Sequence, residues 1–503
     1  MRVSRSALAA AALLAAVPLA RTGAQQATDP TAALLQEVIR ANSSNPPGVT
    51  QGVADVLGPK FKALGFEVTV IPTPDSGKVH FFARLRGDGS KKPVLLAAHA
   101  DVVGVEREKW TLDPFAGVIK DGNVYGRGAI DFKGGMAVFA RAAMMLAENK
   151  VPLARDVIFL AEADEEGQPL NTSWLAANGH WDLMDAEFAL NEGGWIMKRD
   201  DGSVRYVSIS TLDKSSQTIT LTARGTSTHS SMPLPDNAIF RLGRALAKVG
   251  EYRTPVELTA STRQFYETLG RTTNDAALKQ AFFDLVSNDP AKVKAADLKI
   301  SENPLLHSIM RNTIAAVLVN GGFRSNVIPG SAEATLNIRT IPGTDVPALV
   351  KELERVINDP MVEVRVGGAG GARGGRGGAT AGGARGGAVG AGRGGAAGAR
   401  GGATGGRGAS AESPTSGELY DALVREAKAA YPGAEVTPYL FQAGTDAGAW
   451  RSRGIPVYGI YPYAISDDEL SRMHGNDEHV SIESLRKGTE MIYRTILSVA
   501  KKQ

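Results

Sequence analysis

Three short apolar segments of the chain run directly into side chains that can bind a metal ion. Each is followed by a histidine or by carboxylates: 93–98 by His99, 157–161 by Glu165 and Glu166, and 187–190 by Glu192. Continuous apolar runs of this length predict strands that are covered on both faces. In α/β sheets the ends of such strands gather the ligands. The sequence therefore favours a buried sheet with a polar site along one edge.

Two further residues complete a set of six side chains of types that bind metals. Asp131 lies in the glycine-rich stretch 125–135, and His474 lies in the motif 473–479. Neutral imidazoles mixed with carboxylates suit zinc, and a carboxylate with two free oxygens can bridge a pair of ions. Two zinc ions held close together can turn a shared water into hydroxide at neutral pH. This chemistry points to hydrolysis of an amide bond.

Each motif taken alone has an ordinary structural explanation. The glycines of 125–135 could cradle a phosphate, but neither glycine-loop spacing fits; the alternative is that close packing needs glycines there while Asp131 projects into a site. Glu165 and its neighbour would form a solvated acidic turn if no cation lay between their carboxylates. Asp101 and His99 face the same way on an extended chain, so Asp101 can fix the tautomer of a metal-bound His99.

The N-terminus has the features of a secretory signal. Two arginines precede the apolar segment 8–20, which is too short to span a bilayer, and small residues then predict a mature start near Gln25. We therefore expect a signal peptide at 1–24 and a periplasmic or secreted protein that is free of the membrane after cleavage; an uncleaved anchor is the alternative. The chain has no cysteine, which excludes disulfides, a lipoprotein anchor and thiolate metal sites.

Residues 367–415 are rich in glycine, alanine and arginine. Such a segment cannot bury enough apolar surface to offset its chain entropy, so we expect a disordered linker. The alternative, an arginine–glycine tract that binds nucleic acid, lacks interleaved aromatic residues for base stacking. The stretch 367–410 carries six arginines and no acid, so the formal net charge of +3 hides a mildly acidic remainder. We therefore expect no nucleic-acid partner.

The expected elements divide the rest of the chain into two domains. Strand and helix alternation over 25–212, completed by helices and a strand in 416–503, predicts a three-layer α/β/α catalytic domain. Residues 213–366 show the order strand–helix–strand–strand–helix–strand of a small ferredoxin-like α+β domain, with extra helices within 252–309. Because this part lies between motif-bearing halves of the catalytic domain, we expect an inserted lid.

Together and in this order, the five motifs resemble a family of dizinc exopeptidases and deacylases. The family includes aminoacylase, acetylornithine deacetylase, succinyl-diaminopimelate desuccinylase, glutamate carboxypeptidase and carnosinase. The resemblance runs from about Asp29 to the C-terminus. It implies a zinc-peptidase catalytic domain, a dimerisation-type lid through which the chain could form a homodimer, and two zinc ions per chain. Cobalt and manganese accept the same ligands and stay open as alternatives.

The resemblance also implies a role for each metal-type residue. His99 and Glu192 are expected to bind one zinc, Glu166 and His474 the other, and Asp131 to bridge the two ions.

The resemblance carries further catalytic and substrate-binding roles. Glu165 is the expected general base, and Asp101 the residue that holds His99. His229, in the lid, resembles the histidine that in many members crosses a dimer interface and stabilises the oxyanion in the neighbouring site; a contact at the N-terminus of the following helix is the alternative. Four residues resemble the elements that hold the substrate: Asn326, Arg339, Gly444 and Thr445.

We therefore expect an exported, metal-dependent hydrolase that cleaves the amide bond of a small peptide or an N-acyl amino acid by means of a metal-bridged hydroxide. Carboxypeptidase, dipeptidase, aminopeptidase and aminoacylase activities all stay open. The alternative is a catalytically silent relative used for binding or assembly, which is expected only if a ligand or Glu165 were missing, and none is. The remaining histidines have no expected ligand role: His80, His180, His307 and His479.

Overall fold

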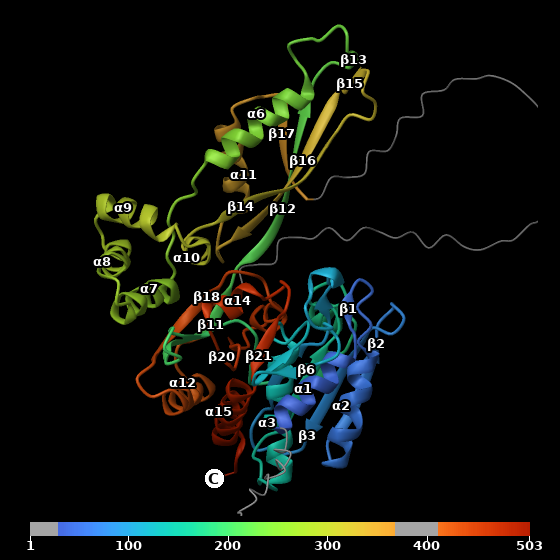
Figure 1. Ribbon diagram of the computed structural model, residues 1–503, viewed down its shortest axis with the longest axis vertical. Coiled ribbons are helices and arrows are strands. Elements are labelled where there is room, and N and C mark those ends of the chain that lie inside the picture. The colour runs from blue at the N-terminus through green and yellow to red at the C-terminus, as the bar shows by residue number, and fades with distance from the viewer. Residues whose placement is uncertain (1–28, 168, 368–410, 503) are drawn as a thin grey trace, which may run out of the picture.

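The computed structural model describes residues 29–167, 169–367 and 411–502. The expected signal peptide at 1–24 and most of the expected linker at 367–415 lie outside these ranges. Figure 1 shows a large α/β part below and a smaller α+β part above it. Within the described ranges, no helix is long and apolar enough to cross a bilayer.

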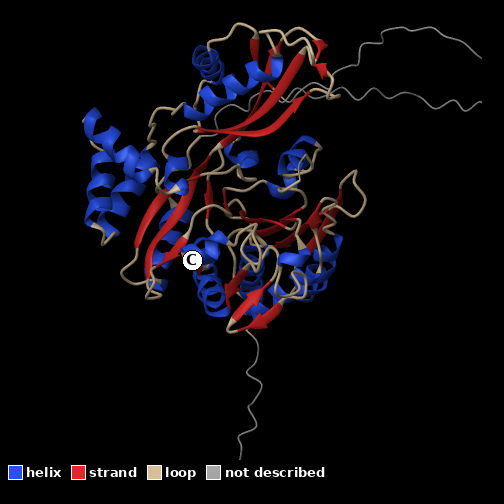
Figure 2. Ribbon diagram, turned by 45° about the horizontal axis from the view of Figure 1, so that its top comes forward, coloured by secondary structure: helices blue, strands red, loops and turns tan. Residues whose placement is uncertain are grey.

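A ten-stranded sheet forms the centre of the large part (Figure 2). Strands β8, β4, β9 and β19 are mutually parallel neighbours near its middle. Since parallel strands end at the same edge of a sheet, the residues that follow β4, β8 and β9 meet there. In spatial order the strands are β2 (Glu67–Pro72), β3 (Val79–Leu85), β8 (Val157–Glu162), β4 (Val94–His99), β9 (Phe188–Asn191), β19 (Val457–Gly459), β11 (Val204–Asp213), β10 (Ile196–Lys198) and β20 (Ala464–Ile465), with β18 (Glu435–Phe441) paired to β11.

Helices cover both faces of this sheet. Along β4, Leu96 faces one hydrophobic core and Leu95 the other, as the alternation of side chains along a strand requires. The first core packs against α1 (Pro30–Arg40), α2 (Gln51–Ala63), α3 (Lys133–Glu148), α12 (Glu418–Ala430) and α15 (Ile482–Ala500). The second packs against α4 (Thr172–Ala177), α5 (Trp181–Met184) and α13 (Gly448–Arg451). The predicted three-layer α/β/α arrangement is confirmed.

The lid is a four-stranded antiparallel sheet with two helices on one face. Its core joins Ile219 and Leu221 of the sheet to Leu242 and Leu353 of the helices. The observed order of elements along the chain and across the sheet is that of a ferredoxin-like domain, as predicted. The strands are, in spatial order, β14 (Thr313–Gly321), β16 (Ser331–Thr340), β12 (Ser215–Arg224) and β17 (Val362–Val366), and the helices are α6 (Ala238–Glu251) and α11 (Val346–Ile357).

The extra helices pack against the catalytic domain and not against the lid sheet. The ring of Phe265 lies 5.5 Å from that of Tyr206 in β11 and 4.9 Å from that of Tyr439 in β18. The range 213–366, expected to form one lid, therefore contributes to two hydrophobic cores. The helices are α7 (Ala260–Thr272), α8 (Ala276–Leu285), α9 (Pro290–Ile300) and α10 (Pro304–Ile309), at the left of Figure 1.

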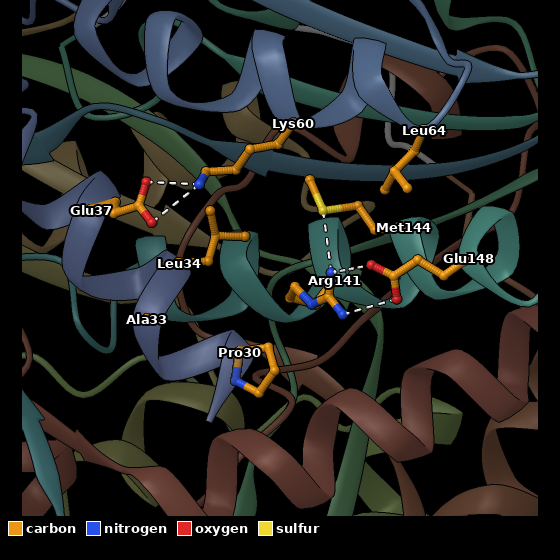
Figure 3. Close-up of a pocket in the computed structure, with 9 residues that line it drawn as sticks. All are labelled: Pro30, Ala33, Leu34, Glu37, Lys60, Leu64, Arg141, Met144 and Glu148. Carbon is orange, nitrogen blue, oxygen red and sulfur yellow. Dashed lines mark hydrogen bonds and ion pairs between the residues drawn. The ribbon is translucent and has the colours of Figure 1, made fainter. Parts of the chain in front are cut away.

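A pocket of about 390 Å³ opens among α1, α2 and α3 (Figure 3). Its charged groups already pair with one another: Glu37 lies 2.9 Å from Lys60, and Arg141 lies 2.8 Å from Glu148. None of the six metal-type residues lines it. This pocket is therefore separate from the candidate site.

Candidate metal centre

The edge of the sheet supplies four of the six metal-type side chains. His99 is the last residue of β4. Glu165 and Glu166 lie in the turn after β8, and Glu192 directly follows β9. The parallel order of β8, β4 and β9 explains why residues so far apart in the sequence meet here.

Asp131 reaches the same place from the loop that precedes α3. The glycines beside it allow close packing: a Cβ on Gly135 would lie 2.1 Å from the ring of Phe132, and one on Gly134 would lie 2.2 Å from the carbonyl oxygen of Ala129. The glycine-rich stretch therefore packs the loop tightly against α3, which is the alternative to phosphate binding that the sequence allowed.

His474 comes from a loop near the C-terminus. The loop connects α14 (Asp467–Ser471) to β21 (His479–Ser481), which pairs with β7 (Asn123–Tyr125) just before the Asp131 loop; β7 in turn pairs with β6 (Val118–Lys120). This small sheet brings the His474 and Asp131 loops together. The side chain of His474 is 45% exposed, whereas that of His99 is 2% exposed.

Five of the six side chains form two overlapping groups that share Asp131, and Glu165 lies outside both. Oδ1 of Asp131 lies 3.2 Å from Nε2 of His99, and its Oδ2 lies 3.0 Å from Nε2 of His474. Glu192 completes the first group at 3.5 Å from His99, and Glu166 the second at 3.0 Å from His474. Two ligand atoms on one tetrahedral zinc are about 3.4 Å apart, given bonds of about 2.1 Å. The residues present therefore fit metal binding, and His99, Asp131 and Glu166 lie close enough together to hold an ion.

The buried carboxylates of the cluster need positive charge beside them. Burial raises the pKa of Glu192 to about 8, and burial together with the Glu192 carboxylate raises the pKa of Glu165 well above its usual range. Hydrogen bonds to Asp131 and Glu166 raise the pKa of His474 to about 10. In the ion-free molecule, protonated groups thus offset the crowded carboxylates, a task that bound cations would take over.

Asp101 contacts more of the site than the sequence indicated. Nδ1 of His99 donates to the backbone carbonyl of Asp101 at 2.9 Å, while the Asp101 carboxylate is 3.6 Å away, beyond a hydrogen bond. That carboxylate instead accepts the backbone N–H groups of Glu165 and Glu166, each at 3.1 Å, and the amide of Asn45 at 2.8 Å. Asp101 therefore holds both His99 and the acidic turn.

Two residues at the site were missed by the sequence analysis. The hydroxyl of Tyr461 lies 3.0 Å from both Asp131 and Glu192, which fixes their orientation. Glu478, which is completely buried, accepts the backbone N–H of Asp131 at 3.0 Å. Tyr461 could have been found from its position at the end of an apolar strand-like run. The role of Glu478 could not, because its partner is far away in the sequence.

Of the four predicted substrate residues, Arg339 and Gly444 lie near the metal cluster. A Cβ on Gly444 would lie 4.0 Å from a terminal nitrogen of Arg339. Burial lowers the pKa of the Arg339 guanidinium, and the charge of the nearby Glu165 carboxylate offsets part of this shift. Thr445 donates a 2.6 Å hydrogen bond to Asp213, so its hydroxyl is already bound within the protein.

Strands β13 (Thr228–His229) and β15 (Val327–Ile328) pair with each other at the far tip of the lid (Figure 1). His229 ends β13, and Asn326 directly precedes β15. The backbone N–H of Ser230 donates to the Asn326 carbonyl at 3.0 Å. His229 is exposed and its ring bonds Ser231 at 2.8 Å. Within the described chain, no hydrogen bond or ion pair connects either residue to the cluster.

Other histidines have partners outside the cluster. His80 is buried and accepts the backbone N–H of Ala163 at 3.2 Å; burial lowers its pKa to about 4. His479 stacks on Tyr125 with 4.5 Å between ring centroids. These contacts support the structural roles expected for both.

Comparison with known proteins identifies the family. The model of peptidase family M20/M25/M40 matches residues 95–498. Probable carboxypeptidase S-like 2 of Dictyostelium discoideum is 27% identical over 422 residues, which cover 82% of this chain and 73% of the relative. Human N-fatty-acyl-amino acid synthase/hydrolase PM20D1 is 25% identical over 423 residues, which cover 83% and 76%.

Solved structures show the same fold. An M20 family metallo-carboxypeptidase from Sulfolobus solfataricus superposes with a TM-score of 0.65 at 18% identity, over 94% of this chain and 99% of the other. Human carnosine dipeptidase 1 gives 0.60 at 17% identity, over 93% and 95%. Fold and site thus define a metal-dependent hydrolase. The chain belongs to peptidase family M20/M25/M40.

Proposed function

We propose that this protein uses two zinc ions to hydrolyse the amide bond of an N-acyl amino acid or a small peptide. One observation carries the proposal: the two oxygens of Asp131 face two different histidines, each of which has a second carboxylate beside it. A single-ion site does not need a shared carboxylate. Cobalt and manganese suit the same donor set.

The residues around the cluster divide the chemistry between them. Bound ions would supply Lewis acidity, which polarises a carbonyl and activates water. Glu165 takes the proton of the attacking water and later delivers it to the leaving amine. Burial beside the Glu192 carboxylate raises the pKa of Glu165, which makes its carboxylate a stronger proton acceptor than an exposed one. Asp101 holds the backbone of Glu165 in place at 3.1 Å.

Arg339 favours substrates that end in a free carboxylate. It is partly buried beside Glu165, and no side chain of the described residues forms an ion pair with it. A planar guanidinium can give a carboxylate two parallel hydrogen bonds. The names of the two relatives fit such a substrate, since carboxypeptidase substrates and N-acyl amino acids both carry a free carboxylate.

Replacing Arg339 by Met is expected to raise KM for carboxylate-ended substrates about 10- to 100-fold, because one charge-assisted bidentate contact contributes about 1.5–3 kcal/mol. Steady-state kinetics with an N-acyl amino acid and its C-terminal primary amide would measure this. The amide analogue, which carries no charge, is the matched control. An equal loss for both substrates would show that Arg339 does not read the carboxylate.

The hydrolase proposal is tested with a mixed panel of N-acyl amino acids and dipeptides. The mature chain is assayed free of metal and after addition of zinc or cobalt, and released amino acids are detected by mass spectrometry. Metal-dependent release is expected, and the products separate deacylase from peptidase. Absence of release with two ions demonstrably bound would favour the catalytically silent alternative.

We also propose that the lid mediates a homodimer in which His229 serves the neighbouring site. Strand β14 is an edge of the lid sheet and leaves Val317, Leu318 and Val319 52–66% exposed. Unpaired edges that carry apolar side chains tend to pair with another strand. Light scattering of the purified chain would give its mass, and a monomer that is fully active would exclude this arrangement.

Export is the remaining proposal, supported by the basic and apolar segments within 1–24. Sequencing the N-terminus of the mature protein is the direct test. A start near Gln25 is expected, and an intact Met1 in an exported protein would show an uncleaved anchor.

A further inference from the structure

Glu478 and Arg127 form a reciprocal contact, which we call the clasp, between the loops of two metal-type residues. Glu478 lies four residues after His474, and its carboxylate contacts the loop that carries Asp131. One oxygen accepts the backbone N–H groups of Ile130 and Asp131 at 2.7 and 3.0 Å. The second accepts Arg127 at 2.5 Å and the backbone N–H of Gly128 at 3.2 Å.

Arg127 completes the clasp in the opposite direction. It lies four residues before Asp131, and its second terminal nitrogen donates to the carbonyls of His474 and Gly475 at 3.2 and 2.9 Å. The side chains of both clasp residues are at most 2% exposed. Each loop thus sends one charged side chain onto the backbone of the other.

The two histidines of the cluster differ in how much other support they have. His99 ends a central strand whose neighbours lie on both sides, and its ring bonds the Asp101 carbonyl. His474 lies on an irregular loop, has a left-handed backbone with φ +61°, and is 45% exposed. A residue with a Cβ adopts this backbone region only at a cost, so surrounding contacts must hold the loop.

We infer that Glu478 and Arg127 are positioning residues that fix His474 against Asp131 and so set the affinity of the Glu166–His474 metal site. The inference rests on the proposed two-ion function. Removing outer contacts of metal ligands typically lowers metal affinity about 10- to 100-fold. The loss should be much larger at this site, because the clasp holds both of its loops. The other site shares only Asp131 with the clasp and takes His99 and Glu192 from the sheet.

Stepwise zinc affinity of the full mature chain tests the inference, measured by competition with a chromophoric chelator. Reference variants His99→Ala and His474→Ala assign the two binding steps to the two sites. Glu478→Gln keeps the shape of the side chain but replaces one accepting oxygen by an amide nitrogen, which cannot accept from the N–H donors of the Asp131 loop. It is expected to weaken the His474 step 10- to 100-fold and to change the His99 step much less. Excess zinc should restore turnover.

Arg127→Met and Arg155→Met form a matched pair of controls. Arg155 is also fully buried and bridges distant segments, through Glu187 and Glu418 at 2.8 Å each, without contact to the cluster. Of the two, only Arg127→Met should weaken zinc binding at the Glu166–His474 site. This variant also keeps the inference testable if Glu478→Gln fails to fold. Equal weakening of both steps, no weakening, or the same effect from Arg155→Met would overturn it. Two bound zinc ions without amide hydrolysis in the unmodified chain would overturn the proposed function instead.

Discussion

Replacing Glu165 by Gln is expected to lower kcat by roughly 10²- to 10⁴-fold while two metal ions stay bound. A positioned general base contributes about this factor, and the amide of glutamine cannot accept and return the proton. Metal binding should persist because Glu165 lies outside both three-residue groups around Asp131. Turnover of an N-acyl amino acid and metal content by mass spectrometry would be measured on the same sample.

The matched control is Glu302→Gln, an exposed residue that pairs with Lys299 and with no other charged group of the described ranges. It should keep the turnover of the unmodified protein. Near-normal turnover of Glu165→Gln would show that another group takes the proton. A large loss of metal in that variant would instead make Glu165 a ligand.

The central strands and the metal-type residues that follow them were predictable because their signal is local. A strand buried on both faces must be apolar throughout, so β4 and β8 stand out in the sequence, and the polar residue that follows each strand stands out too. His99 and Glu192 were located in this way. Their mutual distance then follows from the parallel order of the strands.

Strands β11 and β18 were missed because polar residues and a proline interrupt their patterns. Ser208 and Ser210 are fully buried within β11, where their hydroxyls bond neighbouring groups. Pro438 lies within β18, which pairs with β11 alone among the described strands, so its other edge is one where a missing N–H costs little. Hydrophobic patterns cannot detect a buried polar side chain whose partner is elsewhere in the chain.

The surroundings of the ligands could not be predicted for a related reason. Tyr461 and Glu478 act through residues about 330 and 350 positions away in the sequence. Likewise, an amphipathic helix such as α7 shows that it has an apolar face but not which sheet that face covers. The family resemblance supplied roles for His229 and Asn326, and the structure shows that these two lie side by side at the lid tip.

Replacing Asp131 by Ala is expected to remove both metal ions from the site and to lower turnover roughly a thousandfold or more. Among the described residues, Asp131 alone has an oxygen within 3.2 Å of each of the two histidines, so one substitution removes a ligand from each group. The Lewis acidity of bound ions contributes several kcal/mol to such reactions, and each 1.4 kcal/mol is tenfold in rate. Metal content per chain and turnover at fixed zinc would be measured together.

Glu192→Ala is the matched comparison for Asp131→Ala, because Glu192 faces His99 alone among the histidines of the cluster. This variant should weaken the binding of one ion. It should leave the other ion bound, because Asp131, Glu166 and His474 are intact. The bridging role thus predicts two ions lost in one variant and one in the other. If both variants lose the same single ion, Asp131 serves one site only, and the two-ion arrangement proposed for this protein is wrong.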